Sequence, residues 1–310
     1  MVAGGPNLPE DLPIVLPEAF AAALRGLPPL AVAFSGGLDS RFLCHAARLC
    51  GCDVLALHAR GPHIPPEESA QAAQWARENA LPLLLVDFDP LALPEVAANS
   101  RERCYGCKKG LITTLRMALR ETEGERDESR RLLCDGSNAD DLRAFRPGLR
   151  ALAEAGVRSP LAEAGLSKET IRALAASTGL DRPEQKARPC LLTRLAYGLS
   201  PDAGTLARLA RAESALAQLS APGHAPGGTP DSAPVWGDFR LRLTPAPLLQ
   251  VTRLPGNAGP LAEAVLSEHG FAPCEIRLTD KVSGFFDGSC AACDSGIGPG
   301  LDFAIEKVYE

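Results

Sequence analysis

Short apolar runs alternate with helical stretches along the first part of the chain. The apolar runs have the length of buried β-strands and span residues 30–34, 53–58, 83–87 and 131–135. The helical stretches span residues 67–79, 107–120 and 167–178. Strands that alternate with helices predict a parallel sheet that is covered on both faces and binds ligands at the carboxyl ends of its strands.

The pattern changes after this first part. A helix is predicted over residues 201–219, and the Gly, Pro and Ser residues of 220–234 predict a flexible insertion. Alternating apolar and polar positions then predict strands at 238–243, 248–253 and 275–278, with a helix over 259–269. Because 310 residues exceed the usual length of one domain, we expect an α/β domain over residues 1–198 and a smaller α+β domain over 199–310.

Composition narrows the class of partner. The chain has 45% hydrophobic and 23% charged residues, as ordinary soluble proteins do. A net charge of −6 and a pI near 5.5 argue against the broad basic face that nucleic acid requires. No segment approaches the roughly 18 apolar residues of a membrane-spanning helix. We therefore expect a cytoplasmic protein with a small anionic substrate, and the sequence leaves a homo-oligomer open.

The loop SGGLDS at residues 35–40 follows the first predicted strand directly. A Ser/Gly turn between a strand and a helix directs backbone N–H groups and the helix dipole at one point, where a polyphosphate can bind. The two glycines allow close approach of the phosphate and a positive φ. The loop lacks the lysine of a Walker A motif and the spacing of GxGxxG. The alternative is a turn that only caps the helix.

Ten cysteines in a chain without a secretory signal are better interpreted as thiols or metal ligands than as disulfides. Cys104 and Cys107 form a CxxC motif at the start of a predicted helix, which can hold a metal, close a disulfide or remain an unligated pair. The motif CAAC at 290–293 has the same three options. Four cysteines in apolar stretches are predicted to be buried: Cys44, Cys50, Cys52 and Cys134.

Cys190 is a candidate nucleophile. Lys186, Arg188 and Arg194 flank it, and nearby cations favour a thiolate. The alternative is a buried cysteine in the turn after Pro189.

Polar residues also follow the fourth predicted strand. Asp140 and Asp141, after Asn138, could bind Mg²⁺ or orient a substrate, and they could equally be acids that favour a helix N-terminus. Arginines that can bind phosphate or carboxylate follow at Arg146, Arg150 and Arg158, with surface salt bridges as the alternative.

Several phrases together resemble one family. They are SGGLDS, RCYGCKK at 103–109, DGSNADDLRAFRPGLRA at 135–151, RSPLAEAGLSK at 158–168 and CLLTRLAYG at 190–198. In this order and spacing they resemble LarE, the ATP-dependent sulfur transferases that help to build a nickel-pincer cofactor. The resemblance implies a pyrophosphate-loop (PP-loop) domain of the adenine nucleotide α hydrolase type.

The resemblance also implies an activity. A PP-loop enzyme of this family uses ATP and Mg²⁺ to adenylate a carboxylate of a pyridinium biscarboxylate mononucleotide, and then transfers sulfur to give a thiocarboxylate. The implied ATP-binding residues are Phe34, Ser35, Gly36, Gly37, Asp39, Ser40 and Gly136, with Asp39 helping to hold Mg²⁺. The candidates for binding substrate or Mg²⁺ are Asn138, Asp140, Asp141, Arg146 and Arg194.

Sulfur could be delivered in two ways, both of which involve Cys190. In the sacrificial version of the family, this cysteine gives up its own sulfur and becomes dehydroalanine. In another version, three cysteines hold a [4Fe–4S] cluster whose open iron accepts a further sulfide. Because Cys104, Cys107 and Cys190 match that set, we favour the cluster.

Two departures from the family concern the substrate: QKARPC precedes the cysteine at 190, and Arg277 stands where the family has an acid. Two other functions remain open on the sequence. One is a PP-loop enzyme that thiolates tRNA, and the other is a non-catalytic nucleotide-binding carrier of sulfur or metal. An ammonia-using synthetase is compatible with the loop alone and leaves the three cysteines unexplained.

Overall fold

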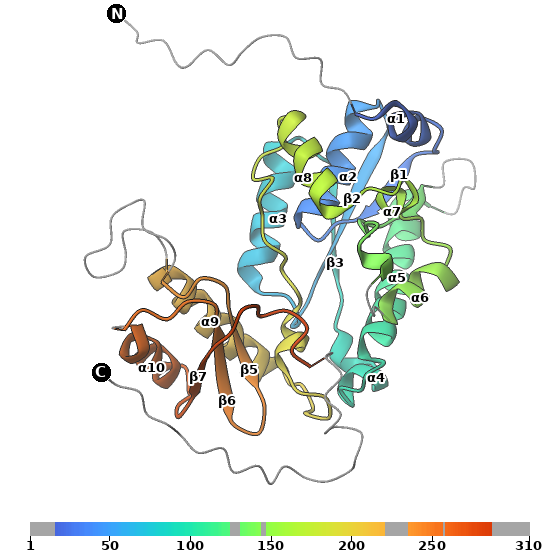
Figure 1. Ribbon diagram of the computed structural model, residues 1–310. Helices are drawn as coiled ribbons and strands as arrows, with labels where there is room; N and C mark the ends of the chain where they lie inside the picture. Colours follow the sequence, from blue (N-terminus) through green and yellow to red (C-terminus); the bar gives the residue numbers. More distant parts are fainter. Residues whose placement is uncertain (1–15, 125–130, 144–146, 221–234, 257, 287–310) are drawn as a thin grey trace, which may run out of the picture.

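Four parallel strands form the central sheet, in the order β3-β2-β1-β4 (Figure 1). Each lies within two residues of an apolar run that predicted it: β1 (Leu30–Ala33), β2 (Val54–Arg60), β3 (Leu83–Asp87) and β4 (Leu132–Cys134). Residues 30–32 are fully buried because β1 pairs with β2 on one side and with β4 on the other. A strand covered on both faces is apolar along its length, which explains its sequence LAVA.

Helices cover both faces of this sheet. In Figure 1, α2, α3 and α8 lie on one face and α5 and α6 on the other. The helices of this part are α1 (Glu18–Arg25), α2 (Leu38–Leu49), α3 (Pro66–Glu78), α4 (Pro94–Ala97), α5 (Arg103–Glu123), α6 (Pro147–Glu154), α7 (Pro160–Glu163) and α8 (Lys168–Ser177). The helices predicted at 67–79, 107–120 and 167–178 correspond to α3, α5 and α8. Ser167 caps α8, since its hydroxyl accepts the N–H of Thr170 at 3.1 Å.

A second, smaller sheet follows. Its strands are β5 (Phe239–Leu243) and β6 (Pro247–Val251), which are antiparallel, and β7 (Glu275–Leu278), which is parallel to β6. Helices α9 (Ala203–Ser220) and α10 (Ala258–Glu268) pack against it. The predicted fold class, a parallel-sheet α/β domain with a smaller α+β unit, is confirmed. The domain boundaries stay a prediction, and the apolar side chains of Leu191, Leu192 and Leu195 pack in the core of this second sheet.

The computed structural model describes residues 16–124, 131–143, 147–220, 235–256 and 258–286. Three predicted features lie outside these ranges: the insertion at 220–234 apart from Ser220, the CAAC motif at 290–293, and Arg146. Among the described helices, none combines the length and the apolar composition that crossing a membrane requires.

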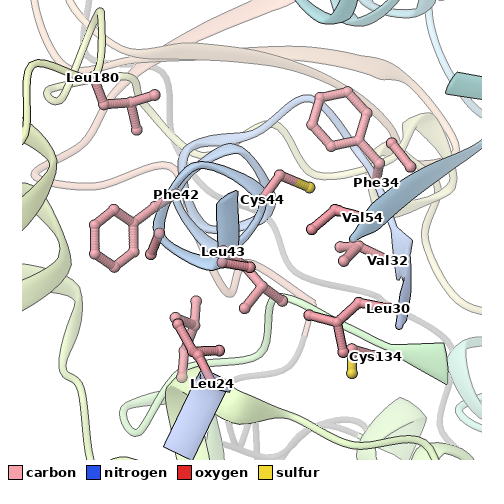
Figure 2. Packing of buried hydrophobic residues seen from close by; sticks show 14 of the residues in the cluster. Leu24, Leu30, Val32, Phe34, Phe42, Leu43, Cys44, Val54, Cys134 and Leu180 are labelled. Carbon is pink, nitrogen blue, oxygen red and sulfur yellow. The ribbon is translucent and has the colours of Figure 1, made fainter. Parts of the chain in front are cut away.

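The core beneath β1 contains two of the predicted buried cysteines. Figure 2 shows the sulfur atoms of Cys44 and Cys134 among aliphatic side chains, and both residues are fully buried. Burial raises the pKa of Cys134 to about 12, so this thiol stays protonated at neutral pH. The prediction of burial is wrong for Cys50 and Cys52, which are only partly buried in the turn between α2 and β2.

The carboxyl ends of β2 and β3 approach each other so closely that one position must be glycine. A Cβ at Gly61 would lie 1.9 Å from the carbonyl oxygen of Phe88, a distance that no side chain tolerates. We expect Gly61→Ala to lower the free energy of unfolding by about 3 kcal/mol, because the two strand ends must separate. Urea unfolding measures this change. Gly256→Ala is the control, since no atom lies within 4 Å of a Cβ there; equal stability of the two variants would contradict the expectation.

Candidate functional site

The loop SGGLDS lies at the carboxyl edge of the central sheet, between β1 and α2. Gly36 has a φ of +73°, and a Cβ there would lie 2.7 Å from the Cβ of Ala72 on α3. Gly37 has an extended backbone, and a Cβ there would meet only the Ser35 hydroxyl, at 3.3 Å. The expected positive φ is therefore confirmed for Gly36 and wrong for Gly37.

Hydrogen bonds within the loop connect its two serine side chains to each other and to the backbone. The hydroxyls of Ser35 and Ser40 lie 3.2 Å apart, and the Ser40 hydroxyl donates to the carbonyl of Gly37 at 3.0 Å. The loop after β4 presses against this turn, since a Cβ at Gly136 would lie 2.9 Å from the backbone nitrogen of Ser40. The close contacts at Gly36 and Gly136 therefore exclude a larger residue at either position.

The side chain of Phe34 belongs to the core. It is 2% exposed and stacks on Trp75 with ring centroids 5.7 Å apart. Its carbonyl oxygen is hydrogen-bonded to Nδ1 of His58 at 2.8 Å. The side chain of this predicted ATP-binding residue thus packs in the core and fixes the backbone where the loop begins.

Asp39 carries the strongest indication of a missing ligand. Its Oδ2 pairs with Nζ of Lys168 at 2.6 Å, whereas its Oδ1 is buried without a hydrogen-bond partner. A buried polar atom is normally satisfied, so an unpartnered carboxylate oxygen beside an anion-binding turn fits a divalent cation. The donor set therefore agrees with Mg²⁺. Lys168 was not among the predicted site residues, although it ends the phrase RSPLAEAGLSK.

The polar residues after β4 mainly hold their own loop together. Oδ1 of Asn138 accepts the N–H groups of Asp140 and Asp141 at 3.0 and 3.3 Å, and Oδ2 of Asp141 accepts the N–H of Asn138 at 3.1 Å. Asp140 reaches further, since its Oδ2 accepts the N–H of Lys168 at 2.8 Å. These bonds link the loop to the start of α8. A direct role in binding Mg²⁺ or substrate stays a prediction for all three residues.

Three cysteines lie near one another around the start of α5. Cys104 and Cys107 lie one helical turn apart, and Cys107 and Cys190 both pack against the core of the second sheet. The pKa of Cys107 is raised to about 12, mainly by burial and to a smaller extent by the neighbouring thiols of Cys190 and Cys104. Burial also raises the pKa of Cys190, more than Arg194 and Arg103 lower it. The prediction that flanking cations favour a Cys190 thiolate is therefore wrong.

Buried polar side chains tie α5 to the residues after Cys190. Nδ2 of Asn99 donates to the carbonyls of Ala196 and Leu199 at 2.7 and 2.8 Å. Nη1 of Arg103 donates to the carbonyl of Leu195 at 3.2 Å. Both side chains are at most 4% exposed, so this clamp fixes the two cysteine-bearing segments relative to each other.

The three thiols are donors of the type that hold an iron–sulfur cluster. Within the described ranges, no three His, Cys, Asp or Glu side chains converge as the ligands of one metal ion must. Ligands of an iron–sulfur cluster bind separate irons, so their sulfurs need not meet at one point. Three cysteine thiols on two clamped segments are a donor set of that kind.

A cleft of about 600 Å³ lies beside the Cys190 segment, between residues 185–188, α3, α9 and β5; we name it the anion cleft. Its basic side chains are Lys186, Arg188, Arg194, Arg240 and Lys281. Its acidic side chains are Glu67, Glu68, Glu213, Asp238 and Asp280. Burial raises the pKa of Glu68 and lowers that of Arg240, so both of these charges in the cleft wall are partly desolvated.

Arg194 joins this cleft to the cysteine segment. Its guanidinium donates to Oε2 of Glu213 at 2.7 Å and to the carbonyls of Pro189 and Cys190 at 2.8 and 3.3 Å. The side chains of Arg194 and Glu213 are only 6% and 14% exposed. The pair therefore anchors the backbone at Cys190 to α9.

The two remaining candidate arginines lie in surface salt bridges. Arg158 makes two bonds to Glu163, at 2.8 and 2.5 Å, and Arg150 donates to Glu102 at 2.6 Å and stacks over Tyr105. Both arginine side chains are about half exposed. The alternative interpretation holds for both.

Three known proteins are similar in sequence. An uncharacterized protein of Synechocystis is 37% identical over 192 residues, which cover 61% of this chain and 68% of that protein. Pyridinium-3,5-bisthiocarboxylic acid mononucleotide synthase of Lactiplantibacillus plantarum is 31% identical over 203 residues, which cover 65% and 71%. An uncharacterized protein of Methanocaldococcus jannaschii is 30% identical over 166 residues, which cover 54% and 60%. No family model matches the chain.

The pair of Arg194 and Glu213 yields a stability prediction. We expect Glu213→Gln to lower the free energy of unfolding by about 3 kcal/mol, because it leaves a buried guanidinium without its counter-charge. Thermal and urea unfolding measure this. Glu163→Gln breaks an exposed pair and serves as the control, with an expected loss below about 1 kcal/mol. A loss as small for Glu213→Gln as for the control would show that the buried pair anchors nothing.

The raised pKa values of Cys107 and Cys190 predict the order of alkylation in reduced, metal-free protein. A thiol with a raised pKa is mostly protonated at pH 8 and reacts faster as the pH rises toward that pKa. Cys104 is exposed, so we expect iodoacetamide to modify it at least about tenfold faster than Cys107 at pH 8. Peptide mass spectrometry measures each rate. Equal rates at the two positions would contradict the burial of Cys107.

Proposed function

This chain belongs to the LarE family, and we propose that it uses ATP to activate a carboxylate of a pyridinium mononucleotide and then replaces one carboxylate oxygen by sulfur. The observation that carries the proposal is the oxygen of Asp39 that lacks a hydrogen-bond partner in a Ser/Gly turn, in a chain whose Cys104, Cys107 and Cys190 lie near one another. The first feature suits phosphate activation with a divalent cation, and the second suits sulfur transfer.

The nucleotide loop is arranged for adenylation. Backbone N–H groups of the turn and the start of α2 would bind the phosphates of ATP, and Lys168 would neutralise part of their charge. Asp39 would hold Mg²⁺ through its free oxygen. A substrate carboxylate that attacks the α-phosphate then forms an acyl adenylate and displaces pyrophosphate, whose charge these groups stabilise.

The anion cleft suits the rest of the substrate. A pyridinium biscarboxylate mononucleotide carries carboxylates and a phosphate, and Lys186, Arg188 and Arg240 offer N–H donors to such oxyanions. Since residues 185–188 line the cleft and lead to Cys190, a substrate bound there would lie next to the segment that carries this cysteine.

The three cysteines support a cluster. Cys104, Cys107 and Cys190 would hold it, and a cluster with three protein ligands supplies an iron with an open position for a further sulfide. The competing route is sacrificial: the Cys190 thiolate attacks the acyl adenylate, displaces AMP and forms a thioester, and elimination then releases the thiocarboxylate and leaves dehydroalanine. The clamped pair of Cys104 and Cys107 has no part in that route, which is why we prefer the cluster.

The two other functions have weaker support. A tRNA-thiolating enzyme needs a basic surface, and the chain has a net charge of −6. A non-catalytic carrier would bind ATP without releasing pyrophosphate. Location in the cytoplasm and assembly into a homo-oligomer stay predictions.

The activation step is tested by release of pyrophosphate from ATP in the presence of the pyridinium biscarboxylate mononucleotide. We expect Asp39→Asn and Lys168→Met each to reduce the rate about 100-fold or more, because each removes a charge that faces the departing phosphates. Arg60→Lys changes an exposed salt bridge and should retain the wild-type rate. Variants as fast as the wild type would contradict the assignment of the loop, and ATP binding without any release would favour the carrier.

The sulfur route is tested by anaerobic reconstitution with iron and sulfide, followed by iron analysis and visible absorption spectroscopy. We expect a cluster in the wild type and in a Cys50→Ala control, and its loss in Cys104→Ala, Cys107→Ala and Cys190→Ala. A cluster that survives in Cys104→Ala would contradict the ligand set. Absence of any cluster, together with a loss of about 34 Da at Cys190 after turnover, would establish the sacrificial route.

A further inference from the structure

Arg41 is a fully buried arginine in the first turn of α2, directly after the nucleotide loop. All five of its N–H groups are used on one short segment. Nη1 donates to the carbonyl and to Oδ1 of Asp181, at 2.9 and 2.8 Å, and Nη2 donates to the carbonyl of Arg182 at 3.1 Å. Nε and Nη2 donate to Oε1 of Gln185, at 3.1 and 2.7 Å. The guanidinium thus fixes residues 181–185 as a unit.

Residues 181–185 have few other hydrogen bonds, whereas the residues after them are also held by the second sheet and its neighbour: Arg240 donates to the carbonyl of Ala187 at 3.3 Å and Arg194 to that of Pro189 at 2.8 Å. Helix α8 ends at Ser177, and the backbone from residue 181 to residue 190 forms turns and irregular structure. Trp75 adds one bond, from Nε1 to Oδ1 of Asp181 at 2.6 Å. A buried guanidinium carries a large desolvation penalty, which a hydrophobic side chain in the same place would avoid. The planar fork of arginine makes this set of bonds, and neither lysine nor an apolar residue can reproduce it.

Gln185 connects three parts of the site. Its Oε1 accepts from Arg41, its Nε2 donates to the carbonyl of Gly36 in the nucleotide loop at 3.4 Å, and its side chain lines the anion cleft. The residues that follow it, Lys186 to Arg188, form part of the cleft wall and lead to Cys190. A change at the Gly36 carbonyl therefore reaches the cleft through one side chain.

We propose that Arg41 and Gln185 are positioning residues that couple occupancy of the nucleotide loop to the placement of the segment bearing Lys186, Arg188 and Cys190. Arg41 anchors the segment to α2. Gln185 links the nucleotide loop to the cleft wall, because its side chain contacts both. When phosphate fixes the loop, the Gly36 carbonyl becomes a fixed acceptor for Gln185, and the segment is held more firmly. The coupling goes beyond the proposed function and rests on it only in taking a nucleotide as the ligand of the loop.

Hydrogen–deuterium exchange of the full chain, with and without a non-hydrolysable ATP analogue and Mg²⁺, tests the proposal. In the wild type we expect the nucleotide to slow exchange over residues 186–190 by about fivefold or more. Gln185→Glu keeps the acceptor for Arg41 and removes the donor to Gly36. It should match the wild type without nucleotide and lose the nucleotide-dependent protection. If Gln185 served only to fold the protein, the variant would also exchange faster without nucleotide.

Two further variants test the anchor. Gln185→Ala removes both contacts of the side chain but keeps Arg41 paired with Asp181, and Arg41→Lys keeps the charge but not the fork. Both should exchange faster over residues 181–190 even without nucleotide. Arg60→Lys, on an exposed salt bridge, is the matched control and should behave as the wild type.

The results separate the claims. Wild-type protection of residues 186–190 by nucleotide in Gln185→Glu would overturn the coupling, and wild-type exchange in both anchor variants would overturn the positioning role. If the nucleotide fails to protect residues 34–40 in the wild type, the proposed function and the coupling both fail, while exchange without nucleotide still decides the positioning role.

Discussion

The pairing of β1 with a parallel strand on each side is the constraint on which the site depends. Because β1 is central and fully buried, the turn that follows it can only emerge at the carboxyl edge of the sheet, between the loops after β2 and β4. Gly36 and Gly136 then allow two neighbouring elements to contact this turn closely.

Buried charges then connect this edge to the rest of the molecule. Asp39 pairs with Lys168 at the start of α8, Arg41 binds the segment that follows α8, and Arg194 pairs with Glu213 on α9. The first two pairs join residues 129 and 140 positions apart in the sequence, and the third joins residues 19 positions apart. The nucleotide loop, the cysteines and the anion cleft are thereby placed relative to one another by side chains that are costly to bury and therefore specific in their geometry.

The fold was largely predictable from the sequence. The chemistry of the site was predictable only in part. Apolar runs located all four strands of the central sheet, because strands buried on both faces must be apolar. The protonation of the Cys190 thiol was mispredicted because the cations close to it in sequence do not all act on it. Lys186 pairs with Asp238 instead, and burial raises the pKa of Cys190 more than the nearby arginines lower it. Lys168 was missed because its partner is 129 residues away. Cys50 and Cys52 adjoin a core helix but lie in a turn that leaves them partly exposed.

The central claim is that one site activates a carboxylate with ATP and then exchanges oxygen for sulfur. Mass spectrometry of the pyridinium mononucleotide after anaerobic incubation with the protein, ATP, Mg²⁺ and sulfide tests it most directly. The account predicts a thiocarboxylate in which one oxygen has been replaced by sulfur, formed only with ATP and accompanied by an equal amount of AMP. An unchanged mononucleotide, or a thiocarboxylate that forms without ATP, would contradict it.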